Sequence, residues 1–180
     1  MSPSLIRDRD ALVAELRRRG VDYLAPSDAA ASSEIDDSTL LASLASHGDP
    51  RIRQALMALF LLHPRLHELV RKVRDDLSPP ASHDLLAYYL AAVYLQEMWK
   101  VLLDRYLPGT ERLPDGLCRE VGLPSREALH GKAGLHALAE WHAGGAWPSF
   151  NHLSEYEGVA ELLLESFRLR RGGVAVAAGR

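Results

Sequence analysis

Residues 48–66 read GDPRIRQALMALFLLHPRL, and this stretch decides the fold of the chain. Asp49 is a favourable helix N-cap, and Pro50 suits the first helical position, where a missing N–H costs nothing. The residues that follow are apolar on almost every side, which is typical of a helix buried all round. Pro64 lacks an N–H and disfavours helical geometry at His63, so the helix is predicted to end there.

A second helix is predicted to begin at Pro64. Its buried stripe is expected to consist of five apolar residues at helical spacing, namely Leu66, Leu69, Val70, Val73 and Leu77. The Asp-Pro-x-x-Arg opening, the apolar helix after it and the Pro-led second helix together resemble one unit of a HEAT-type helical repeat, over about residues 46–74. The resemblance implies helical layers whose grooves bind other proteins.

Helix caps, helix-breaking Pro and Gly residues and the spacing of apolar residues predict the organisation of the whole chain of 180 residues. They predict an N-terminal helix within residues 1–20, a connector over 21–33, a helical domain over 34–171 and a flexible tail over 172–180. Seven helices are expected, over about residues 4–19, 34–46, 50–62, 64–77, 82–107, 125–142 and 154–170. No alternating strand pattern occurs, so we expect an all-α fold, a single compact multi-helix domain with a long central helix over 82–107.

Composition argues against several classes of function. The net charge of −3 supplies no overall positive field, so nucleic-acid binding is not favoured. The single cysteine, Cys118, cannot form an internal disulfide, and the first residues lack the apolar core of a signal peptide, so a cytoplasmic location is expected. No apolar run approaches the roughly 20 residues that a membrane helix needs, so no membrane association is expected.

Eight histidines raise the question of a metal site. His130, His136 and His142 recur every six residues, which scatters them around the axis of a straight helix. His-Glu-x-x-His and Cys-x-x-Cys motifs are absent from the sequence, as are phosphate-binding glycine loops. We therefore expect neither a metal nor a cofactor.

The densest polar cluster lies near the C-terminal end of the chain, within residues 136–157. Its candidate binding residues are His136, Glu140, His142, Asn151, His152 and Glu157. A histidine one helical turn from a carboxylate can transfer protons, because imidazole titrates near neutral pH and the carboxylate orients it. The alternative is structural: Asn151 and Ser154 cap the last helix, Glu157 completes a capping box, and the histidines satisfy backbone groups at a glycine-rich corner.

Two functions follow from these patterns. The first is a cytoplasmic helical scaffold or adaptor that binds a partner protein, since helical layers form grooves without requiring catalytic residues. The alternative is a small-ligand-binding protein or an enzyme that uses the His/Glu/Asn cluster at residues 136–157. The sequence makes no prediction of the oligomeric state.

Overall fold

The computed structural model describes residues 5–24, 34–144 and 152–177, and these form an all-α fold without strands. The expected fold class is therefore confirmed. The helices of this part of the chain are α1 (Arg9–Arg18), α2 (Asp37–Ala45), α3 (Pro50–Leu62), α4 (His67–Asp75), α5 (Pro79–Met98), α6 (Lys100–Tyr106), α7 (Gly116–Glu120), α8 (Lys132–Ala143) and α9 (His152–Ala177). Two 3₁₀ turns, η1 (Pro64–Leu66) and η2 (Ala128–Gly131), precede α4 and α8.

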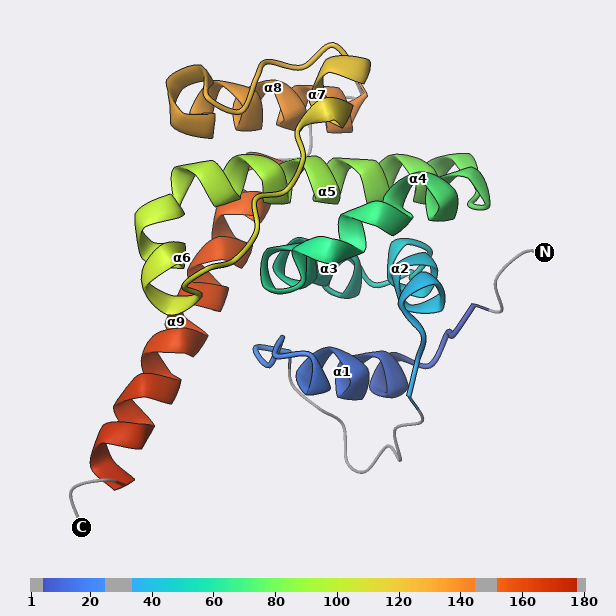
Figure 1. Ribbon diagram of the computed structural model, residues 1–180. Coiled ribbons are helices and arrows are strands. Elements are labelled where there is room, and N and C mark those ends of the chain that lie inside the picture. The colour runs from blue at the N-terminus through green and yellow to red at the C-terminus, as the bar shows by residue number, and fades with distance from the viewer. Residues whose placement is uncertain (1–4, 25–33, 145–151, 178–180) are drawn as a thin grey trace.

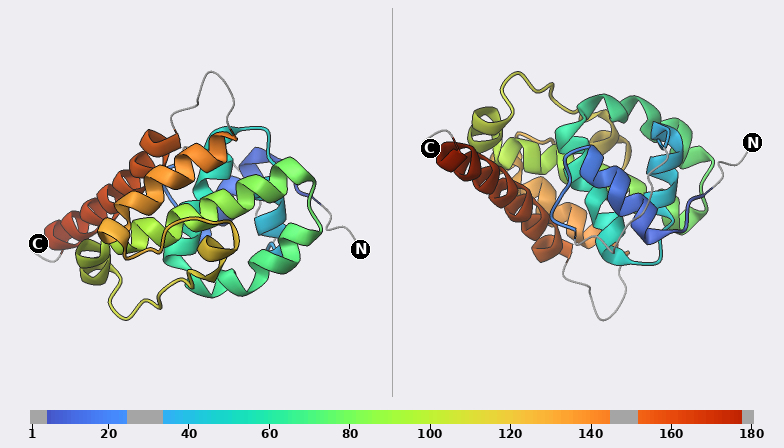
Figure 2. Two further views of the ribbon diagram at one scale, coloured as in Figure 1. Left: turned by 90° about the horizontal axis from the view of Figure 1, so that it is seen from above. Right: turned by 90° about the horizontal axis from the view of Figure 1, so that it is seen from below.

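Helix α5 runs through the centre of the molecule. Its residues from Leu85 to Leu95 are all buried, which fits a helix covered on every side. Helices α3 and α4 pack against one side of it and α8 against another, and α9 crosses near its middle (Figure 1). Figure 2 shows the same arrangement from above and below, with α1 on the far side of α3 from α5. The site described below forms where α3, α5, α8 and α9 meet.

The corner at Pro64 forms as the sequence predicts. The side chain of Asp49 accepts a hydrogen bond from the backbone N–H of Arg51 at 2.9 Å and caps α3. Helix α3 ends at Leu62, because His63 adopts φ −128° and ψ 70° before the proline. The second helix starts more tightly than expected, as η1, and becomes α-helical at His67.

Two predicted helices are divided or shortened. The long helix expected over 82–107 is two helices, α5 and α6, with a break at Trp99. The helix expected over 125–142 begins only at Lys132, because Leu129 and His130 have positive φ angles of 49° and 53°. Such left-handed residues cannot continue a right-handed helix. Helix α7 lies where no helix was expected, so with the division of the central helix the described residues contain nine α-helices where about seven were expected.

The first and last described helices, α1 and α9, pack on the same core. Leu12 and Leu16 of α1 are fully buried in the apolar cluster that also contains Leu163 of α9, so the core is continuous from α1 to α9. Arg19 at the end of α1 donates to the carbonyl of Ile35 at 2.9 Å, across the expected connector. Residues 25–33 of that connector lie outside the described residues. Helix α9 extends to Ala177, beyond the expected end near residue 170.

None of the described helices has the length and apolar character needed to cross a membrane.

Candidate functional site

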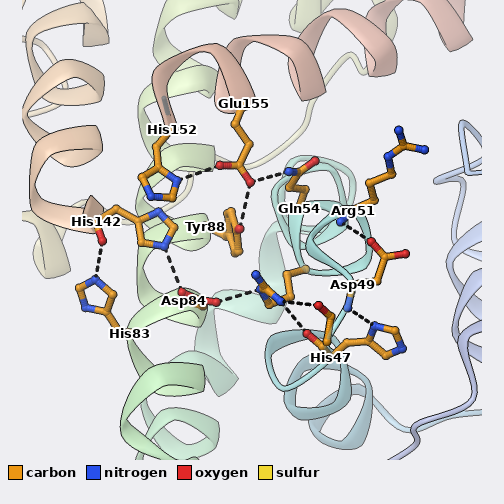
Figure 3. A network of polar contacts seen from close by, with 12 residues as sticks. His47, Asp49, Arg51, Gln54, His83, Asp84, Tyr88, His142, His152 and Glu155 are labelled. Atoms are coloured by element: carbon orange, nitrogen blue, oxygen red, sulfur yellow. Dashed lines mark hydrogen bonds and ion pairs between the residues drawn. The ribbon is translucent and has the colours of Figure 1, made fainter. Parts of the chain in front are cut away.

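A polar network lies where α3, α5, α8 and α9 meet (Figure 3). We call it the histidine network. Its members come from four helices that are far apart in the sequence, and each makes a hydrogen bond or ion pair to another member. They are Arg53 and Gln54 of α3, Asp84 and Tyr88 of α5, His142 of α8, and His152, Glu155 and Tyr156 of α9.

His142 is the centre of the network and is buried. Its Nδ1 lies 2.6 Å from the hydroxyl of Tyr156, and its Nε2 lies 3.1 Å from Oδ1 of Asp84. All three groups are satisfied if Nε2–H donates to the carboxylate and Nδ1 accepts from the phenol, which is the neutral form of the ring. Burial lowers the pKa of His142, and the hydrogen bond to Asp84 offsets this only in part. The ring is therefore held neutral near pH 7.

Asp84 connects His142 to an arginine. Burial acts to raise the pKa of its carboxyl, but the hydrogen bond from His142 and the charge of Arg53 outweigh this and lower it. Arg53 Nε lies 2.9 Å from Asp84 Oδ2 as an ion pair, although its N–H is not aligned as a hydrogen bond. Arg53 Nη1 donates to the carbonyls of His47, at 2.7 Å, and Gly48, at 3.2 Å. The chain of contacts thus joins α8 through α5 to the turn before α3.

The carboxylate of Glu155 is hydrogen-bonded to side chains from three helices. It accepts from Gln54 Nε2 at 2.5 Å, from the hydroxyl of Tyr88 at 3.1 Å, and its other oxygen lies 2.8 Å from His152 Nδ1. Its side chain is only 7% exposed. A buried carboxylate with three hydrogen-bond donors has its hydrogen-bonding capacity filled. These hydrogen bonds connect the start of α9 to α3 and α5.

The two histidines stack face to face. The ring centroids of His142 and His152 are 3.9 Å apart, with 21° between the ring planes. His83 in the first turns of α5 lies beside them, with its Nε2 3.2 Å from the carbonyl of His142 and its ring 4.2 Å from that of Trp141. The network therefore contains two histidine–carboxylate pairs, His142 with Asp84 and His152 with Glu155, in contact through their rings.

Of the six candidate residues named from the sequence, the structure brings two together, His142 and His152. Asn151 lies outside the described residues. His136 and Glu140 are exposed, and no hydrogen bond or ion pair joins them to each other or to another described residue. The buried face of α8 passes through Leu135, Leu138 and His142, which turns both residues to solvent.

Glu157 does not complete a capping box. Helix α9 begins at His152, so Ser154 and Glu157 lie inside the helix and Ser154 is not its N-cap. The neighbouring Glu155 and Tyr156 supply the contacts to the network instead. Asp84 and Arg53 were not identified from the sequence as members of the site. They are separated from His142 by 58 and more residues, so only helix packing brings them together.

The chemistry open to the network is limited by burial. Tyr156 is fully buried and its pKa is raised by burial and by nearby carboxylates, so the phenol stays protonated. No three His, Cys, Asp or Glu side chains in the described part of the chain gather where they could hold a metal ion. The chemistry that remains is proton transfer within a histidine–carboxylate pair, either His142 with Asp84 or His152 with Glu155.

A second feature is a groove beside α9, with a volume of about 610 Å³. One wall is Trp99, at the break between α5 and α6. The other wall runs along α9 and consists of Gly158, Glu161, Leu162, Leu164, Glu165 and Arg168. We call it the α9 groove. Leu162 is half exposed there.

Comparison with known proteins found no match to this chain among family models, curated proteins or solved structures.

Proposed function

We propose that this chain is a small helical scaffold that binds a partner protein in the cytoplasm, through the α9 groove. The observation that carries the proposal is the shape and lining of that groove. Its residues on α9 run from Gly158 to Arg168, a rise of about 15 Å along the helix axis. An elongated groove of this kind suits a helix or an extended segment of another protein.

The lining has the composition of a protein interface. Trp99, Leu162 and Leu164 are apolar, and Glu161, Glu165 and Arg168 are charged. Interfaces combine apolar and polar groups in this way, and tryptophan is enriched at their energetic centres. The HEAT-like opening of residues 46–74 supports the same proposal, because HEAT units build binding surfaces from packed helices.

Site-specific cross-linking tests this proposal. A photo-reactive amino acid replaces Leu162 in the α9 groove, and a control places it at Glu120 in α7, an exposed residue outside the groove. After illumination in cells that express the protein, a protein adduct from position 162 and none from position 120 supports the proposal. The absence of any adduct at position 162 would overturn it.

A second candidate function is acid–base chemistry on a small ligand at the histidine network. The specific observation that favours it is the pair of stacked histidines, His142 and His152, each bonded to its own carboxylate. Native mass spectrometry of protein purified from its source tests it. A small molecule that copurifies with the wild type and is lost from His152→Ala, with the fold intact, would favour this function over the scaffold.

A further inference from the structure

We propose that the occupant of the α9 groove is α9 of a second copy of this chain, so that two copies form a two-fold dimer with their α9 helices antiparallel. This inference rests on the proposed function, because it names the partner at the same groove. It is carried by three features of α9: an exposed apolar seam, a projecting end, and a separation of charge along its outer face.

The seam consists of exposed apolar residues at the spacing of a helix pair. Leu162 is 50% exposed and Leu169 is 68% exposed, and they lie seven residues apart on one side of α9. Gly158, four residues before Leu162, has no atom within 4 Å of a Cβ position, so a neighbouring helix can approach closely there. Gly158, Leu162, Glu165 and Leu169 follow the alternating steps of four and three residues that mark the contact seam of paired helices.

The C-terminal end of α9 projects from the fold. It extends beyond the other helices in the views of Figures 1 and 2. Of the residues of α9 up to Arg170, the last buried one is Phe167. Beyond it, Arg170 Nη2 donates to the carbonyl of Gly20 at 2.7 Å and pairs with Asp22 at 2.6 Å, so one side of the helix contacts the segment after α1. The other side, with Leu169, is exposed and open to a second α9.

The charges on the outer face decide the orientation. Glu161 and Glu165 lie toward the N-terminal end of the groove, and Arg168 lies at its C-terminal end. Arg168 already reaches Glu165 within its own helix at 3.3 Å. A parallel pair would place like charges opposite each other, whereas an antiparallel pair places the acidic end of one helix beside the basic end of the other.

The same geometry is self-complementary. A two-fold axis midway between Glu165 and Ser166 sets Leu162 opposite Leu169 of the second copy, and Leu169 opposite Leu162. Each patch then contacts the identical patch, as a closed two-fold dimer requires. The surface therefore fits a second copy without any other partner being needed to cover the leucines.

Sedimentation velocity over a range of protein concentrations tests the inference. The wild type is expected to dimerise, and Leu162→Glu and Leu169→Glu are each expected to raise the dimer dissociation constant about tenfold or more. The matched control is Leu129→Glu in η2, where the leucine is 76% exposed but lies outside the groove, and it should leave the constant unchanged. Circular dichroism melts establish that all variants are folded.

Charge-reversal variants test the antiparallel orientation of the dimer independently. Arg168→Glu makes the face wholly acidic, and Glu161→Arg combined with Glu165→Arg makes it wholly basic. Each variant alone should be monomeric at concentrations where the wild type is dimeric, and an equimolar mixture of the two should recover the dimer.

The outcomes separate this inference from the proposed function. A wild type that stays monomeric at every concentration, or a dimer that none of these substitutions weakens, overturns the antiparallel α9 dimer. If the cross-linker at position 162 then attaches to a different protein, the proposed function stands. If the adduct is a second copy of this chain and the substitutions abolish it, the dimer is supported.

Discussion

The ring of Tyr94 in α5 lies directly against the backbone of Gly134 in α8. A Cβ atom added at Gly134 would lie 2.0 Å from Cε1 of that ring, and one added at Gly131 would lie 2.7 Å from the Tyr94 carbonyl oxygen. These two glycines allow α8 to approach α5 more closely than any other residues would. The tight approach positions His142, two helical turns further along α8, over the first turns of α5.

Gly134→Ala is therefore expected to destabilise the protein by about 3 kcal/mol, the upper end of the cost of overpacking. The ring of Tyr94 cannot move aside easily, because Tyr94 is fully buried and its hydroxyl donates to the carbonyl of Pro124 at 2.7 Å. Chemical denaturation measures the change in the free energy of unfolding.

Gly158→Ala, measured at a concentration where the protein is monomeric, is the matched control, because Gly158 is also helical but has no neighbour within 4 Å of its Cβ position in its own chain. Alanine favours the helix over glycine, so this variant should gain about 0.5 to 1 kcal/mol. Equal effects of the two substitutions would contradict the close contact at Gly134.

Phe60→Ala is expected to destabilise the protein by about 3 to 5 kcal/mol. Phe60 is fully buried in α3, and its ring meets that of Tyr89 edge to face, with centroids 5.2 Å apart. Urea denaturation gives the free energy, with Val101→Ala as the control. Val101 is 82% exposed, so its truncation should change stability by less than about 0.5 kcal/mol. A loss below about 1 kcal/mol for Phe60→Ala would mean that α3 is not buried as described.

The parts of the fold that were predicted correctly are those with local causes. Asp49 and Pro50 start α3 and Pro64 ends it through capping and proline geometry, which act over a few residues. The break at Trp99 had no such signal, since neither proline nor glycine stands there. Gly131 and Gly134 are compatible in sequence with either a break in the helix or a close helix contact, and both occur: η2 precedes α8 and Gly134 touches Tyr94.

The candidate site was predicted only in part for the same reason. His142 and His152 were recognised because they are close in the sequence, on either side of a stretch that was expected to form a short turn. Asp84 and Arg53 were not, since no spacing rule connects α5 and α3 to α8. The proposed pair of His136 and Glu140 has the correct helical spacing, but that spacing does not say which side of α8 faces the core.

The stability of the protein should decrease as the pH falls below about 6.5, through His142. Burial lowers the pKa of this ring in the folded state, with His152 adding to the effect and Asp84 opposing it. The unfolded chain then binds the proton more tightly than the folded protein, so the contribution of His142 is fully present above its unfolded value of about 6.5 and is lost below it.

Denaturation of the wild type and of His142→Gln at about pH 8 and about pH 5 checks this pH dependence, because the variant lacks the ionisable ring of His142. The wild type should lose more stability between the two conditions than the variant does. Parallel losses would show that His142 is not held neutral by its surroundings.

The histidine network is expected to act as a structural lock between helices. Glu155→Ala removes the acceptor of Gln54, Tyr88 and His152, so it should destabilise the protein by about 1 to 3 kcal/mol. Glu140→Ala is the control, because Glu140 is an exposed helical glutamate without a hydrogen bond or ion pair to the described residues, and it should change stability by less than about 0.5 kcal/mol. Thermal melts and denaturant curves of both variants measure this difference. A binding site would give the opposite pattern, since groups that serve a ligand are often poorly optimised for stability: Glu155→Ala would then fold as well as the wild type and lose its ligand.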